Sequence, residues 1–200
     1  MEEPEQTTEG GEQDELQELD RIRPEPRIYV ASLSDYNAGR LHGVWLNAAQ
    51  EPEQLAEAVQ AMLRASPEPW AEEFAIHDYE HFGPLHLDEY ESLDTISMLA
   101  KGVVEHGPAF AHWVTLIGTR EPEALARFET AYLGHFDSLT KYGEHILDDF
   151  GLRQEFEESV PELLSGYVNI DVTAFARDLE LSGNIKTSEG GGGVYVFEGE

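Results

Sequence analysis

Hydrophobic and polar positions alternate through the first patterned part of this 200-residue chain. Residues 27–32 (RIYVAS) and 41–46 (LHGVWL) are rich in β-branched and aromatic side chains, which is typical of strands. Between them, residues 34–39 (SDYNAG) have the composition of a turn-rich loop. An amphipathic helix is predicted from Pro52, because proline suits the first helical position and apolar residues then recur at helical spacing. Alternation over residues 72–77 predicts a third strand, and strands dispersed around one helix favour an antiparallel α+β arrangement.

The pattern changes to helical spacing in the middle of the chain. Residues 93–107 and 108–118 predict two short apolar helices. They are separated at Gly107-Pro108, a pair that ends one helix and begins the next. Pro122 marks the start of a third helix. We therefore expect a small all-helical segment here.

Mixed patterns return towards the C-terminus. Asp137 and Asp171 are expected to cap helices over residues 139–150 and 172–181, because their carboxylates can accept hydrogen bonds from the free N–H groups of a first helical turn. Residues 184–198 contain two strand-like runs around consecutive glycines, which predicts a hairpin. The C-terminal part is therefore expected to combine helices with strands.

These patterns predict an α+β fold divided into three small domains after an acidic tail. The expected divisions are a disordered tail at residues 1–26, an N-terminal α+β domain with an antiparallel sheet at 27–86, a helical middle domain at 87–127, and a C-terminal α+β domain at 128–200. The tail is expected to be disordered because it is rich in acids and has almost no large apolar residues.

The acidic charge is extreme. Aspartate and glutamate outnumber lysine and arginine by 41 to 12, which gives a formal net charge of -29. Such a charge argues against direct binding to nucleic acid or to an anionic membrane, because both need clusters of basic side chains. It favours a basic partner, although adaptation to high salt or a biased composition would also produce it. Residues 72–94 hold eight carboxylates, and no lysine or arginine occurs between Arg64 and Lys101, so we expect no local neutralising cation there.

The lack of cysteine and of recognisable targeting signals indicates in which compartment the protein is expected. The chain has no cysteine, which excludes disulfides and thiol chemistry and suits a reducing compartment. The first residues are acidic rather than basic, and no apolar run approaches the ~18 residues of a membrane span. We therefore expect a soluble, cytoplasmic protein that does not contact a membrane.

One short motif offers an alternative based on a metal ion. His77, Glu80 and His81 match the H-x-x-E-H pattern of some zinc peptidases. That chemistry requires both histidines one turn apart on a helix, with the glutamate as general base. Here the motif begins on a strand pattern, where the histidines would lie roughly 13 Å apart at ~3.3 Å per residue, too far for one metal. A metal-dependent hydrolase is therefore the less favoured alternative.

Three stretches occur together in an order and spacing that identify a family. They are residues 27–48 (RIYVASLSDYNAGRLHGVWLNA), residues 72–82 followed by 87–94 (EEFAIHDYEHF and LDEYESLD), and residues 169–183 (NIDVTAFARDLELSG). Together they resemble the ArdA-type antirestriction proteins. The resemblance implies three small domains strung in an elongated homodimer that imitates bent B-form DNA. It also implies that the protein blocks the DNA-binding groove of type I restriction-modification enzymes and protects incoming mobile DNA, without catalytic residues, metal or cofactor.

The same resemblance assigns the mimicry to carboxylates that replace DNA phosphates as partners for the enzyme's lysine and arginine side chains. These are Glu72, Glu73, Asp78, Glu80, Asp88, Glu89, Glu91, Asp94, Glu105, Glu121, Glu123, Glu129, Asp137, Glu144, Asp148, Asp149, Glu155, Glu157 and Glu158. It also places the dimer contact in the third domain. The expected interface there is the segment with Val160, Pro161, Leu163, Leu164 and Tyr167.

The charge density of duplex DNA sets a condition on the shape that a DNA mimic must have. Residues 27–200 contain 31 acids and 10 bases, so a dimer of this part has a net charge of -42. Duplex DNA carries one negative charge per ~1.7 Å of its axis, so the charge of this dimer, spread at the same density, would cover a length of roughly 70 Å. A compact domain of this size has a radius of gyration of only ~16 Å, so DNA mimicry predicts an elongated arrangement. The remaining alternative is an acidic protein that sequesters histone-like or other basic DNA-binding proteins, which requires no such shape.

Overall fold

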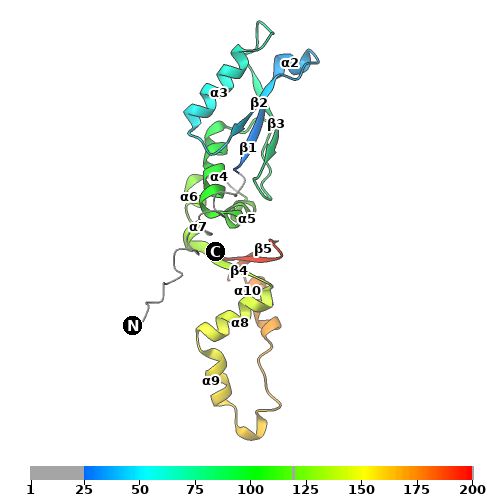
Figure 1. Cartoon of the computed structure of the whole chain (residues 1–200). Coiled ribbons are helices and arrows are strands. Elements are labelled where there is room, and N and C mark those ends of the chain that lie inside the picture. Colours follow the sequence, from blue (N-terminus) through cyan, green and yellow to red (C-terminus); the bar gives the residue numbers. More distant parts are fainter. Residues whose placement is uncertain (1–24, 119, 200) are drawn as a thin grey trace, which may run out of the picture. The chain divides into compact units, whose positions relative to one another are not determined.

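The computed structural model describes residues 25–118 and 120–199 (Figure 1). Nearly all of the predicted tail lies outside these residues. The described residues form two compact units, one containing residues 25–82 and 86–105 and the other residues 83–85 and 106–199. The expected α+β class is confirmed, because each unit combines helices with a small antiparallel sheet. The division into three domains stays a prediction. Among the described helices, none is both long and apolar enough to cross a membrane.

The first unit is built on a three-stranded antiparallel sheet with the order β2–β1–β3. The central strand buries Ile28 and Val30, and the amphipathic helix packed against it buries Leu55 and Val59. The three predicted strands and the helix at Pro52 are confirmed. The elements are β1 (Arg27–Ser32), α2 (Leu33–Asn37), β2 (Gly43–Asn47), α3 (Pro52–Arg64), β3 (Phe74–Glu80) and α4 (Leu93–His106).

The segment at residues 34–39 was expected to be a loop, but most of it belongs to helix α2. Ser32 is the N-cap of this helix, and its hydroxyl accepts a hydrogen bond from the N–H of Asp35 at 3.4 Å. The carboxylate of Asp35 is fully buried and accepts hydrogen bonds from the Ser66 hydroxyl and from Nε of Arg40. The composition did not predict this helix because tertiary contacts to one buried carboxylate, rather than apolar periodicity, anchor it.

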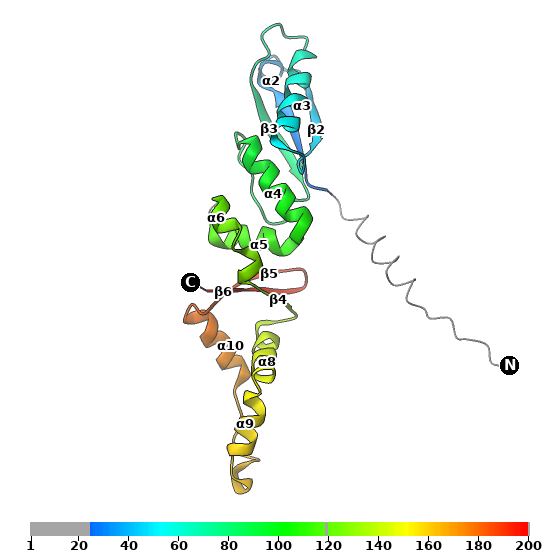
Figure 2. The ribbon, with the colours of Figure 1, turned by 90° about the vertical axis from the view of Figure 1, so that its left-hand side faces the viewer.

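The second unit contains the other antiparallel sheet, in the order β4–β6–β5. Its central strand alternates between two faces, so Val194 and Val196 pack with Tyr142 of α8. On the other face, the ring of Phe197 lies 5.4 Å from that of Trp113 of α5. Figure 2 shows α5 on one side of this sheet and α8 with α10 on the other. The elements are α5 (Pro108–Ile117), α6 (Pro122–Leu125), α7 (Phe128–Ala131), β4 (Tyr132–Phe136), α8 (Leu139–Asp149), α9 (Leu152–Ser159), η1 (Glu162–Leu164), α10 (Val172–Leu181), β5 (Ile185–Gly190) and β6 (Gly193–Glu198).

The helices predicted for the middle of the chain are confirmed as α4, α5 and α6. Gly107 separates the first two with a φ of 68°, and Pro108 is the first residue of α5. Proline at this position loses no helical hydrogen bond, because the first N–H groups of a helix have no partner within it. α5 packs against β5 and β6, so its apolar surface is buried by the sheet of the second unit.

One of the two predicted helix caps is correct and the other is displaced by one residue. Asp171 caps α10, and its carboxylate accepts a hydrogen bond from the N–H of Ala174 at 2.9 Å. At α8 the cap is Ser138 rather than Asp137, and the Ser138 hydroxyl accepts from the N–H of Lys141 at 3.3 Å. Both residue types suit this position, so composition alone did not distinguish the two neighbours.

The predicted C-terminal hairpin is confirmed as β5 and β6. Gly191 and Gly192 connect its strands, with φ values of 61° and 79°. Positive φ at both central positions is the geometry of a tight two-residue turn, which glycine adopts without strain. The strand β4 and the helix α9 had not been predicted.

Candidate acidic interaction surface

The carboxylates that the sequence assigned to a partner lie at the surface of both units. In the first unit they surround β3, occupy the loop that follows it and continue onto α4. In the second unit they extend from the α5–α6 connection to α9. All are exposed except Glu80, Glu91 and Glu144, which are half-buried. A partner can therefore reach nearly the whole set without rearrangement of either core.

The loop after β3 is fixed against the edge of the first sheet. β3 is an outer strand, and the N–H of Ile76 donates a hydrogen bond to the carbonyl oxygen of Glu89 at 2.9 Å. This contact covers a strand edge that would otherwise be open to pairing with another chain. It also holds Asp88 and Glu89 beside the strand, with both carboxylates exposed.

The expectation that residues 72–94 have no neutralising cation is wrong for Glu80. Arg27 and Glu80 are cross-strand neighbours in the β1–β3 register, and Nη2 of Arg27 lies 2.6 Å from Oε2 of Glu80. The hydrogen bond from Arg27 holds the pKa of Glu80 below its ordinary value. The two residues are 53 positions apart in the sequence, so only the strand register brings them together. Glu80 is therefore less available to a partner than an exposed carboxylate without such an ion pair would be.

Local ion pairs offset part of the charge on α8. Nζ of Lys141 lies 2.7 Å from Oε2 of Glu144, and Nε of Arg153 lies 2.7 Å from Oδ1 of Asp148. Such exposed pairs are worth only ~0–1 kcal/mol each, so a basic partner can exchange with them at little cost. α9 buries none of its residues, and its three glutamates are exposed.

The histidine motif does not have the geometry that zinc peptidase chemistry requires. His77 and Glu80 lie on the strand β3, and His81 follows the strand with a φ of 66°. The ring of His77 contacts that of Tyr36 at 4.8 Å, whereas Nε2 of His81 lies 3.8 Å from Glu80. Within the described part of the chain, the ligand atoms of these three residues do not converge as a metal-binding group. The geometry therefore gives the metal-dependent hydrolase no support.

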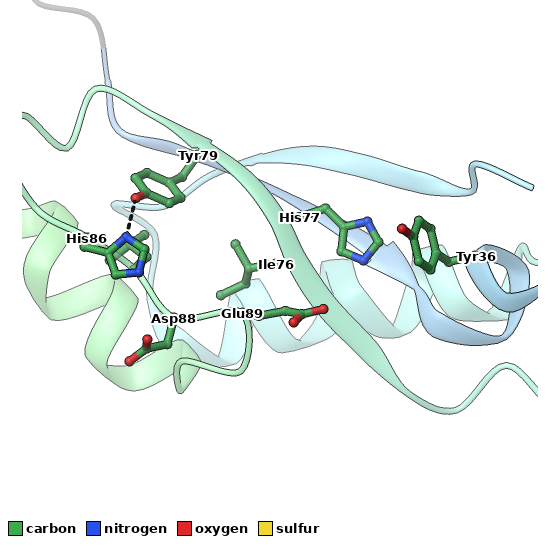
Figure 3. Close-up of a pocket in the computed structure, with 8 residues that line it drawn as sticks. Tyr36, Ile76, His77, Tyr79, His86, Asp88 and Glu89 are labelled. Carbon is green, nitrogen blue, oxygen red and sulfur yellow. Dashed lines mark hydrogen bonds between the residues drawn. The ribbon is translucent and has the colours of Figure 1, made fainter.

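The first unit also has a hollow of about 490 Å³ that no sequence pattern predicts. It lies between α2, β3 and the loop after β3, and its lining includes Tyr36, His77, Tyr79, His86 and Glu89 (Figure 3). These residues come from three separate segments. No spacing in the sequence relates them, because the hollow exists only after the loop has folded back along β3.

Comparison with known families identifies the chain. The family model for the antirestriction protein ArdA matches residues 28–193. Because this match covers most of the chain, the protein belongs to the ArdA family of antirestriction proteins. The resemblance seen in the sequence is confirmed, and family membership supports an antirestriction function, that of an inhibitor rather than an enzyme. A search of curated proteins finds no match.

Proposed function

We propose that this protein inhibits type I restriction-modification enzymes by mimicking B-form DNA. In the cytoplasm, its exposed carboxylates occupy the positions of DNA phosphates in the DNA-binding groove and so protect incoming mobile DNA. The observation that carries this proposal is the exposure of nearly the whole assigned set of carboxylates on a chain of the antirestriction family.

The energetic basis of the proposed inhibition is the release of counterions. The basic groove of a DNA-binding enzyme and the acidic surface of the inhibitor both hold ions in solution, and contact between them frees these ions. Each exposed carboxylate contributes little, because single exposed charge pairs are weak and screened by salt. Inhibition therefore depends on many carboxylates together, and a single Glu→Gln change on the open, solvated part of the surface has little effect.

The proposed active form is a homodimer that joins two acidic surfaces. Leu163 and Tyr167, in the segment expected to form the contact, are 84% and 87% exposed. Neighbouring apolar side chains with this exposure are typical of surfaces that pack against another chain. Val160, Pro161 and Leu164 complete the proposed interface.

A restriction assay with block-neutralised variants tests the proposal. The test variant changes the exposed acids of the β3 region to amides and leaves the paired Glu80 and the half-buried Glu91 intact. The changed residues are Glu72, Glu73, Asp78, Asp88, Glu89 and Asp94. The matched control removes the same charge from the tail, outside the family match, by changing Glu2, Glu3, Glu5, Glu9, Glu12 and Glu15 to glutamine.

We expect the test variant to need at least a ~tenfold higher dose to protect unmodified DNA from a type I enzyme, because several phosphate-like contacts are lost. The tail control should act within about twofold of the unchanged protein. Equal inhibition by both variants would contradict a role for this surface.

A further inference from the structure

We propose that the hollow between α2, β3 and the loop after β3 binds one arginine side chain of the partner protein. This inference rests on the proposed function, because it names one anchoring contact within a wider electrostatic interface. It adds a site at which the partner is recognised by shape and by an aromatic ring, in addition to charge.

Aromatic rings form two walls of the hollow. The ring of Tyr36 is 58% exposed and meets the ring of His77 at 4.8 Å with an interplanar angle of 79°. Farther along β3, the hydroxyl of Tyr79 lies 3.2 Å from Nδ1 of His86, which fixes the orientation of both rings (Figure 3). A planar guanidinium group stacks on aromatic faces more readily than a compact ammonium group does. The walls therefore favour arginine over lysine.

The charge of the hollow suits a cation. Its lining contains Asp88 and Glu89, both exposed, and none of the described residues that line it is lysine or arginine. In Figure 3 the carboxylate of Glu89 extends towards the pair formed by His77 and Tyr36. A carboxylate beside an aromatic ring can pair with a guanidinium while the ring stacks on it. The hydrogen bond from Ile76 to Glu89 holds this loop in place before binding, which reduces the entropy lost on binding.

An unsatisfied polar atom lies in the wall of the same hollow. Nε2 of His77 is buried and, among the described residues, has no hydrogen-bond partner. A buried polar atom without a partner is unfavourable and uncommon in folded proteins. Because this atom is closed to solvent, a ligand in the hollow can reach it only after the His77 ring turns. When the ring proton is on Nδ1, Nε2 is then an acceptor for one of the five N–H donors of a guanidinium. The aromatic walls and the charge of the hollow, rather than this atom, carry the preference for arginine.

A direct binding experiment tests the pocket without any restriction enzyme. The full-length protein is titrated with N-acetyl-arginine-N-methylamide, and the ring resonances of Tyr36 and His77 are followed by NMR. The control probe is the lysine analogue, which has the same charge. Tyr90 is the control residue, because it is 71% exposed and lies outside the lining.

We expect saturable shifts at Tyr36 and His77 with the arginine probe, and at least threefold weaker binding of the lysine probe. Shifts at Tyr90 should be small and should not saturate. Absence of saturable shifts in the pocket, or equal binding of the two probes, would overturn the inference.

A second experiment measures how well variants of the pocket displace DNA from a type I enzyme, and so tests whether this partner uses the pocket. Tyr36→Ala removes one wall and Glu89→Gln removes one charge. Their matched controls are Tyr90→Ala and Glu57→Gln, which change exposed residues of the same unit outside the lining. We expect the pocket variants to raise the concentration needed to displace DNA from a type I enzyme about three- to tenfold, in line with a partly desolvated cation–π contact. The controls should change it less than twofold.

The two experiments separate the inference from the function on which it rests. If the unchanged protein displaces DNA and the pocket variants behave as their controls do, the pocket is no anchor, and the proposed function stands. If the unchanged protein fails to displace DNA while the arginine probe saturates the pocket, the proposed function fails and the arginine site stands.

Discussion

His112 lies in the core of the second unit, where only 8% of its surface is exposed. Its Nδ1 lies 2.7 Å from the Ser188 hydroxyl oxygen, and its ring stacks on that of Tyr195 at 4.3 Å. The ring of His135 contacts the same tyrosine at 4.4 Å. Burial, and to a lesser extent the neighbouring His135, lower the pKa of His112 below its ordinary value of 6.5. The neutral form of this residue is therefore part of the folded core.

This lowered pKa predicts a loss of stability in mild acid. Below about pH 6.5 the unfolded chain takes up a proton on His112 before the folded chain does. The contribution of His112 is thus complete above that pH and falls as the pH drops towards the lower pKa of the folded state, by at most ~1.4 kcal/mol per pH unit. Urea unfolding measured at two pH values, about 7.5 and about 5.5, checks this expectation.

Two variants show whether His112 is the residue responsible. In His112→Asn, the loss of unfolding free energy between the two pH values should be smaller than in the unchanged protein. His145→Asn, which changes a half-exposed histidine paired with Asp149, should not reduce this loss. An unaltered dependence in His112→Asn would contradict the assignment.

The packing of α8 on α10 depends on the small size of Gly143. A Cβ atom at this position would lie 2.9 Å from the Cβ of Ala176 and 3.2 Å from a methyl group of Val172, which is closer than side chains normally approach. The two helices cover the face of the sheet that contains Val194 and Val196. A change in their separation would therefore open the core beneath them.

Gly143→Ala should destabilise the second unit even though alanine is the better helix former. Overpacking of a close contact costs about 1–3 kcal/mol, whereas the gain in helix propensity is only about 1 kcal/mol. Urea unfolding of the single variant and of the double variant Gly143→Ala with Ala176→Gly measures the effect. The double variant should recover part of the loss, because it removes the nearest clashing atom. Greater stability in the single variant would show that the helices separate without cost.

Elements with a strong local pattern could be predicted from the sequence, and elements held by distant contacts could not. α3 and the C-terminal hairpin carry their own periodicity and turn residues. By contrast, α2 depends on the buried carboxylate of Asp35. α9 buries none of its residues, and its only two large apolar side chains, Leu152 and Phe156, are too few to form a periodic pattern. β4 is irregular, because its register with β6 shifts between Tyr132 and Gly134.

The same distinction applies to the candidate site. The exposure of its carboxylates could be predicted, because unpaired acids are seldom buried. The pairing of Arg27 with Glu80 follows from strand register, and the hollow beside Tyr36 follows from a loop that folds back along β3. Neither leaves a signal in residue spacing.

At the scale of the whole molecule, a net charge of -29 opposes folding and self-association through repulsion. Most of the acids assigned to the interaction surface are nevertheless exposed, and they are distributed over the surfaces of both units. A chain with this distribution gains most from a basic partner. The proposed homodimer must also overcome the repulsion between its two copies through apolar contact, which is strongest where large side chains are exposed.

Breaking the proposed dimer contact should therefore separate the two copies without unfolding them. Leu163→Glu combined with Tyr167→Glu adds charge to two exposed positions, so the chain should convert from dimer to monomer in size-exclusion chromatography with light scattering. Leu41→Glu is the control, because Leu41 is an exposed leucine of the first unit, and it should leave the mass unchanged. A dimer that persists in the double variant would place the contact elsewhere.

Competition with DNA tests the central claim most directly. A labelled duplex is bound to a type I restriction enzyme, and the purified protein is added over a range of salt concentrations. DNA mimicry predicts displacement near equimolar dose at low salt, and an affinity that falls at least ~hundredfold between ~50 and ~200 mM salt. Failure to displace DNA at large excess, or displacement that does not depend on salt, would contradict it. In the first case, tight binding to a histone-like basic protein would favour sequestration instead.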